Sequence, residues 1–112
     1  MIKVAVTGAS GFLGQYVLNH LNNLPVEVVA ITRSKHTNLP KLVNGLWVEV
    51  DIQNPPENIF LLMGNPDILI HLAWQGLPNY KSLHHFELEL PIQYDFLSAL
   101  IKEGLQNVVV VG

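Results

Sequence analysis

A glycine-rich segment near the N-terminus has the residue types and spacing of a phosphate-binding turn. It spans residues 7–14 and has the sequence TGASGFLG. Gly8 allows a tight turn, Gly11 lets a pyrophosphate approach the backbone, and Gly14 lets the following helix pack closely on the sheet. Free N–H groups and the helix dipole favour an anion at that position. The segment therefore predicts a dinucleotide site, and the alternative is a glycine turn with no ligand.

The residues that follow the second predicted strand bear on which dinucleotide binds. A carboxylate at that position accepts both ribose hydroxyls of NAD, whereas a cation pairs with the 2′-phosphate of NADP. The sequence has no acid there, but Thr32 followed by Arg33, Ser34 and Lys35. This pattern favours NADP(H), with NAD as the alternative. Arg33 could instead be a solvated surface residue, as long cations on loops usually are.

Five apolar runs rich in Val and Ile predict the strands that position these residues. The runs are continuous rather than alternating, as in strands covered on both faces, and helical periodicity lies between several of them. We expect strands at residues 3–7, 26–32, 46–50, 67–73 and 107–111. With right-handed crossovers, this pattern predicts an α/β fold with a doubly wound parallel sheet of the Rossmann type, in strand order 3-2-1-4-5.

Helices are expected at residues 12–23, 57–63 and 82–103. The first ends before Pro25, and Pro91 should kink or restart the last because it has no N–H. Residues 33–44 are expected to form a loop with one helical turn at 39–43. The apolar stripe of the first helix is expected to contain Phe12, Leu13, Tyr16, Val17, His20, Leu21 and Leu24.

Three segments together resemble one family of enzymes. They are TGASGFLG at residues 7–14, Asp51-Ile52 after the third strand, and His71-Leu72-Ala73 closing the fourth. The chain resembles the N-terminal part of an extended short-chain dehydrogenase/reductase, of the NAD-dependent epimerase/dehydratase group that acts on nucleotide sugars. The resemblance implies a Rossmann domain completed by later strands, a smaller substrate lobe, and a catalytic Ser/Thr with Tyr-x-x-x-Lys.

The catalytic residues of that family have no counterpart in this sequence. The residues four positions after the three tyrosines are His20, His84 and Ser98, so there is no Tyr-x-x-x-Lys. The family's catalytic Ser/Thr follows the fifth strand, where Gly112 is the last residue. We therefore expect residues 1–112 to be the N-terminal part of a Rossmann domain, without a catalytic residue and inactive alone.

The resemblance also assigns roles to residues outside the glycine segment. Asp51 would accept a hydrogen bond from the adenine amino group, with Ile52 supplying an N–H, although Asp51 could instead cap a turn. His71 is expected to be a buried core residue, and Trp74 to cover the ribose, the nicotinamide end or only the sheet edge. The expected cofactor-binding residues are Gly8, Ser10, Gly11, Phe12, Leu13, Gly14, Thr32, Arg33, Asp51, Ile52, Leu72, Ala73 and Trp74.

Composition excludes several other classes of function. Six Lys+Arg against nine Asp+Glu give a net charge of −3, which argues against nucleic acid as a partner. The absence of Cys excludes thiol catalysis and Cys-ligated zinc. No metal site is expected, because the adjacent His84 and His85 would point about 100° apart on a helix. The apolar runs are too short to cross a membrane and the start lacks a signal peptide, so we expect a cytoplasmic protein.

The reaction favoured by this reasoning is reduction of a 4-keto nucleotide sugar, because reducing enzymes draw on NADPH. The alternatives are an epimerase or dehydratase of nucleotide sugars, a reductase of a non-sugar carbonyl, and a non-catalytic NADP-binding sensor or regulator. A homodimer could form through the helical stripe Phe86, Leu90, Tyr94 and Leu97, although the same stripe could pack on the sheet.

Overall fold

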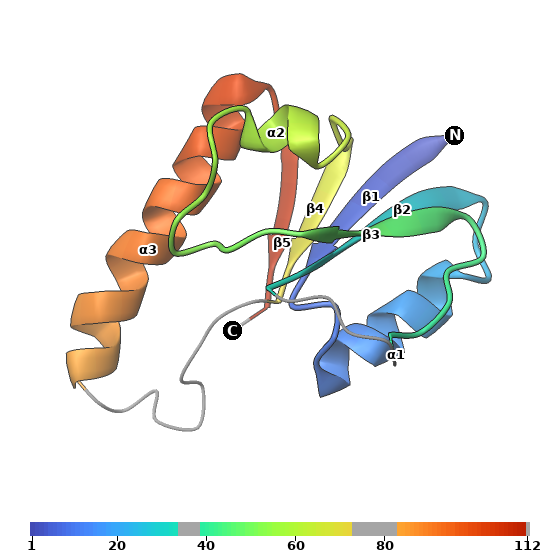
Figure 1. Cartoon of the computed structure of the whole chain (residues 1–112), viewed down its shortest axis with the longest axis horizontal. Helices are drawn as coiled ribbons and strands as arrows, with labels where there is room; N and C mark the ends of the chain where they lie inside the picture. The colour runs from blue at the N-terminus through green and yellow to red at the C-terminus, as the bar shows by residue number, and fades with distance from the viewer. Residues whose placement is uncertain (34–38, 73–82, 112) are drawn as a thin grey trace.

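The computed structural model describes residues 1–33, 39–72 and 83–111, with the backbone alone for residues 83–90. Five strands form one parallel sheet in the order β3-β2-β1-β4-β5. This order confirms the predicted doubly wound Rossmann topology (Figure 1). The strands are β1 (Ile2–Thr7), β2 (Val26–Thr32), β3 (Gly45–Glu49), β4 (Ile68–His71) and β5 (Asn107–Val110).

Helices cover both faces of this sheet. Helix α1 (Phe12–Leu21) lies on one face, and α2 (Ile59–Leu62) and α3 (Leu83–Glu103) lie on the other (Figure 1). Helix α3 continues through Pro91, so of the two predicted outcomes, a kink or a restart, the restart does not occur. Pro91 is on the exposed side of α3, where water can solvate the carbonyl that the missing N–H leaves without a donor.

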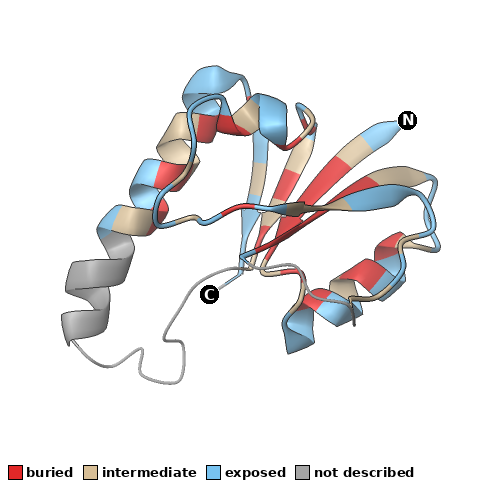
Figure 2. Cartoon of the chain, viewed as in Figure 1, coloured by how far each residue is buried: buried red, intermediate tan, exposed pale blue. Residues whose placement is uncertain are grey.

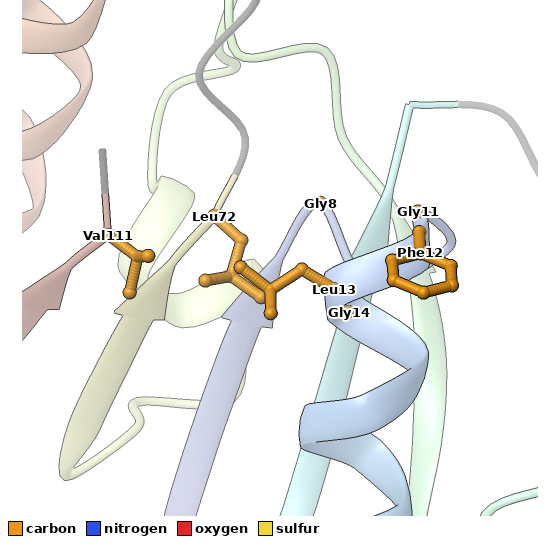
Figure 3. A pocket seen from close by; sticks show the side chains of 7 residues that line it. All are labelled: Gly8, Gly11, Phe12, Leu13, Gly14, Leu72 and Val111. Carbon is orange, nitrogen blue, oxygen red and sulfur yellow. The ribbon is translucent and has the colours of Figure 1, made fainter. Parts of the chain in front are cut away.

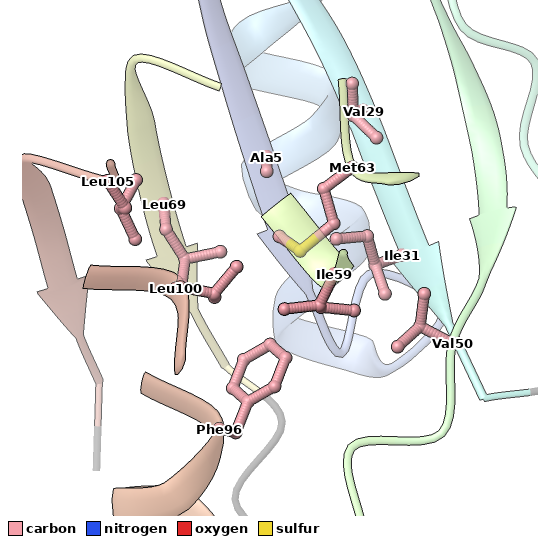
Figure 4. Packing of buried hydrophobic residues seen from close by; sticks show 10 residues of the cluster. All are labelled: Ala5, Val29, Ile31, Val50, Ile59, Met63, Leu69, Phe96, Leu100 and Leu105. Atoms are coloured by element: carbon pink, nitrogen blue, oxygen red, sulfur yellow. The ribbon is translucent and has the colours of Figure 1, made fainter. Parts of the chain in front are cut away.

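Alternate residues of each central strand enter two separate cores. On one face, Val4 and Val6 of β1 and Val28 of β2 pack against α1. On the other, Ala5 and Val29 pack against residues of α2 and α3 (Figure 4). The red segments of Figure 2 accordingly run along the middle of the sheet and the inner sides of the helices. Burial on both faces explains why the strands are continuously apolar in sequence.

Two predicted local structures differ from those observed: one helical turn is absent and one helix is shorter than expected. The helical turn expected at 39–43 is absent from that described stretch. There, the Pro40 carbonyl accepts a hydrogen bond from Trp47 Nε1 at 2.8 Å, and Val43 N–H donates to Asn22 Oδ1 at 3.2 Å. Helix α2 begins later than expected because its N-cap, Asn58, has a left-handed φ of 61°.

The predicted apolar stripe of α1 is also largely wrong. The buried residues of this helix are Gly14, Leu18 and Leu21. Phe12 is 82% exposed and Tyr16 61%, and their rings contact each other edge-to-face with centroids 5.4 Å apart. Close contact of Gly14 with the preceding loop sets the rotation of the helix, so that positions 14, 18 and 21 share the buried face.

Candidate functional site

The glycine segment forms a compact loop between β1 and α1. Gly8 has a left-handed φ of 65°, which an L side chain rarely adopts, and its carbonyl accepts the Gly11 N–H at 3.1 Å. Gly11 is the N-cap of α1 in an extended conformation. Within the described part of the chain, the N–H groups of Phe12 and Leu13 donate to no backbone carbonyl. These two groups are therefore available to an anion at the helix N-terminus.

The glycines at positions 11 and 14 have different structural requirements. A Cβ at Gly14 would lie 2.4 Å from the Gly8 carbonyl oxygen and 2.6 Å from that of Ala9, so the fold itself excludes a side chain there. The helix thus packs closely on the loop at Gly14, whereas the sequence predicted close packing on the sheet. A Cβ at Gly11 would meet only the Gly8 oxygen, at an ordinary 3.4 Å. The open space at Gly11 is what a bound pyrophosphate needs.

The loop is anchored to the end of β2. Ala9 N–H donates to the Ile31 carbonyl at 3.2 Å, and the hydroxyls of Ser10 and Thr32 are 3.2 Å apart. Thr32 is buried, whereas the next residue, Arg33, is exposed at the carboxyl end of the strand. Ser34 and Lys35, the other predicted phosphate contacts, lie outside the described residues.

Asp51 reaches the same edge of the sheet as Arg33. Val50 N–H donates to the Thr32 carbonyl at 2.9 Å, which brings the end of β3 beside the end of β2. Asp51 is exposed, and its Oδ1 accepts the Gln53 N–H at 3.0 Å. The turn-capping role is therefore present in the structure, while the contact with adenine stays a prediction. Ile52 is half-buried against the α2/α3 core.

A buried polar cluster joins the ends of β1 and β4 to α3. The Thr7 Oγ1 lies 2.7 Å from His71 Nδ1 and also accepts the Leu72 N–H at 3.0 Å. On the other side of the ring, His71 Nε2 is hydrogen-bonded to Gln93 Oε1. The three side chains are at most 2% exposed, which confirms His71 as a core residue.

Gln93 is the one member of this cluster that was not predicted from the sequence. It lies three residues before Phe96 and seven before Leu100, which are both fully buried. These spacings place Gln93 on the inward face of α3. A glutamine in register with a buried apolar stripe was the available signal.

A pocket of about 230 Å³ opens where the glycine loop meets the ends of β4 and β5. Leu13 of α1 and Leu72 after β4 extend into the space between these elements (Figure 3). The lining residues are Gly8, Gly11, Phe12, Leu13, Gly14, Leu72 and Val111. Ala73 and Trp74, which were predicted to continue this surface, lie outside the described residues.

Residues 4–112 match the NAD dependent epimerase/dehydratase family. The chain belongs to this family. Its sheet order and its glycine loop at the end of β1 agree with the Rossmann architecture expected for such a protein.

Similar proteins include enzymes that act on nucleotide sugars. The chain is 29% identical over 114 residues to a dTDP-6-deoxy-L-talose 4-dehydrogenase (NAD(+)) from Aggregatibacter actinomycetemcomitans, covering 99% of this chain and 41% of that protein. The chain thus spans about two fifths of the length of this curated relative.

Solved structures show the same fold. A UDP-N-acetylglucosamine 4-epimerase from Bacillus cereus superposes with a TM-score of 0.74 at 24% identity, covering 98% of this chain and 38% of the epimerase. MoeE5 in complex with UDP-glucuronic acid and NAD superposes with a TM-score of 0.69 at 25% identity. The match covers 96% of this chain and 36% of MoeE5.

The described residues, 1–33, 39–72 and 83–111, contain neither a metal-binding cluster nor a membrane-spanning helix. Among the side chains described in these ranges, which leave out those of residues 83–90, no group of three or more of the types His, Asp and Glu is placed to hold a metal ion. No helix in these ranges is both long and apolar enough to span a bilayer.

Proposed function

We propose that this chain binds the pyrophosphate of a nicotinamide dinucleotide at the N-terminus of α1. The observation that carries the proposal is the contrast between Gly14, where the fold excludes a side chain, and Gly11, where it does not. The space at Gly11 adjoins the Phe12 and Leu13 N–H groups, and the positive end of the helix dipole favours an anion there.

Three other predicted cofactor contacts that the structure describes lie along the carboxyl edge of the sheet. Arg33 and Asp51 follow neighbouring strands there and both are exposed, so they can reach the adenosine half of a dinucleotide. Leu72 lines the pocket on the other side of the glycine loop. The described residues therefore fit a cofactor that lies across the ends of β3, β2, β1 and β4.

Within that site we favour NADP(H) over NAD(H). The Thr32 side chain carries no charge and is buried against Ser10, so it offers no carboxylate to a ribose. The exposed guanidinium of Arg33 follows it and has a fork of donors that suits a 2′-phosphate. The name of the talose dehydrogenase specifies NAD(+), and the MoeE5 complex contains NAD, so both dinucleotides have to be compared directly.

For the reaction, we propose reduction of a ketone at C4 of a nucleotide-linked sugar. The talose dehydrogenase, a 4-dehydrogenase by name, supports this position on the ring. When bound, the nicotinamide would supply hydride to the ketone carbon, and the ketone oxygen would take a proton. The residues of this chain would bind and orient the dinucleotide. We propose that residues 1–112 alone bind it without turnover, since they include no Tyr-x-x-x-Lys.

Calorimetric titration of the chain with NADPH, NADH and ADP tests this function. We expect saturable binding of a dinucleotide at one site, weaker binding of ADP, and no hydride transfer to a keto-sugar. Failure to bind any dinucleotide would contradict the proposal. If a longer form of the protein that includes the segments following residue 112 also binds dinucleotide but reduces no carbonyl, the non-catalytic sensor becomes the better interpretation.

A further inference from the structure

The buried cluster of Thr7, His71 and Gln93 contacts the pocket at three points. Thr7 immediately precedes Gly8, His71 immediately precedes Leu72, and the His71 carbonyl accepts the Val111 N–H at 3.2 Å. Gly8, Leu72 and Val111 all line the pocket. The His71 ring thus links β4 to the glycine loop through Thr7, whereas the His71 backbone links β4 to the end of β5. The ring also stacks on Phe96 of α3 with centroids 5.4 Å apart.

The chemistry of Gln93 determines how hydrogens are arranged through this cluster. Gln93 Oε1 is a carbonyl oxygen and only accepts, so the hydrogen of a neutral His71 ring lies on Nε2. Nδ1 is then an acceptor and receives the Thr7 hydroxyl hydrogen. With its hydrogen directed to the ring, Thr7 Oγ1 presents a lone pair to the Leu72 N–H. Each hydrogen bond in the series is thus oriented by the one before it.

We propose that Gln93 is a positioning residue for the cofactor pocket. By accepting from His71 Nε2, it selects the tautomer that orients the Thr7 hydroxyl, and this holds the backbone at Leu72 at a fixed separation from Gly8. Gln93 is not among the residues that line the pocket, and its hydrogen bond to the His71 ring connects it to them. Its importance for ligand binding rests on the proposed function, whereas the orientation of the hydrogen bonds exists without a ligand.

Two measurements on the unliganded chain test the orientation of the hydrogen bonds. Ring ¹⁵N NMR should show His71 as the Nε2–H tautomer, and the Leu72 amide should be protected from hydrogen exchange. In Gln93→Leu, which has a similar shape but no acceptor, we expect a mixture of tautomers and at least tenfold faster exchange at Leu72. In Gln93→Glu, which retains an oxygen at that position, the Nε2 hydrogen should remain. A wild-type ring protonated at Nδ1 alone would overturn the inference.

Cofactor titration of the same variants tests the consequence for the pocket. Gln93→Leu should raise the Kd for the preferred dinucleotide about tenfold, and Gln93→Glu should recover part of this loss. Asp95→Asn, an exposed change on the same helix, is the matched control and should bind as wild type does. Equal affinities for wild type and a folded Gln93→Leu would overturn the inference, whereas failure of the wild type to bind would overturn the proposed function instead.

A second pair of variants gives an answer if Gln93→Leu does not fold. Thr7→Ser keeps the hydroxyl and Thr7→Val removes it at constant shape. Thr7→Val should bind dinucleotide at least tenfold more weakly than Thr7→Ser and should lose protection at the Leu72 amide. Equal affinity and equal exchange in the two variants would show that the hydroxyl only fills space.

Discussion

The fold would accept a side chain at Gly11, whereas the proposed ligand needs the space that a side chain would fill. The Gly11 φ of −78° and ψ of 177° suit any residue, and Asn and Asp are good N-caps. We expect Gly11→Asn to keep the thermal midpoint within a few degrees but to weaken dinucleotide binding at least tenfold. Gly11→Asp should weaken binding further, because its carboxylate repels the pyrophosphate. Calorimetry together with thermal unfolding measures both effects.

Gly14→Ala is the matched control for these variants. Its methyl group would lie 2.4 Å from the Gly8 oxygen, so the helix has to shift. Overpacking of this kind costs about 1–3 kcal/mol of unfolding free energy. The assignment of phosphate to this loop would be wrong if both Gly11 variants bound dinucleotide as tightly as the wild type.

Arg33 carries the prediction about cofactor preference. A hydrogen bond between charged groups contributes about 1.5–3 kcal/mol, so NADPH should bind about ten- to a hundredfold more tightly than NADH at low salt. The preference should shrink as salt screens the pair. In Arg33→Ala it should disappear through weaker NADPH binding, while Lys102→Ala, which removes an exposed cation from the last turn of α3, should retain it. Equal affinities in the wild type would show that Arg33 is a surface residue.

Some site residues could be predicted from the sequence and others could not. The glycine segment was identifiable because its turn chemistry is local: each glycine acts on the backbone within a few residues. His71 was recognisable as a core residue because it interrupts an apolar strand. Its partner Gln93 was not, because that hydrogen bond depends on how α3 packs against β4, 22 residues away in sequence. Only the tertiary structure brings such groups together.

At the scale of elements, strands were easier to predict than helix faces. Burial on both sides makes the middle of a central strand continuously apolar, so β1 and β2 are evident from composition. Helix α1 has apolar residues on its exposed side as well, and periodicity alone could not separate the two faces. The contact of Gly14 with the loop decides between them.

A matched pair of substitutions in α1 tests this assignment of faces. Leu18 is 1% exposed and Phe12 82%. Leu18→Ala removes buried methyl groups and should lower the free energy of unfolding by about 2–5 kcal/mol. Phe12→Ala should change it by about 0.5 kcal/mol or less, as exposed substitutions usually do. Urea denaturation measures both values, and an equal cost for the two would place Phe12 in the core.

At the scale of the whole molecule, the strand order leaves β3 and β5 on the outside of the sheet. Strand β5 and the residue after it expose three branched apolar side chains: Val109 is 52% exposed, Val110 48% and Val111 37%. An outer strand presents backbone N–H and C=O groups to any other strand that approaches, and charged residues normally protect such edges. Here Asn107 is the only polar residue of β5.

We therefore expect residues 1–112 to associate through β5 in a concentration-dependent manner. Val109→Lys places a charge on the exposed edge and should shift the chain toward monomer, as measured by sedimentation at several concentrations. Tyr94→Lys is the control for the alternative helical interface, because Tyr94 is 69% exposed on α3. If Tyr94→Lys dissociates the assembly and Val109→Lys does not, then the copies meet through the helix and the edge of β5 takes no part.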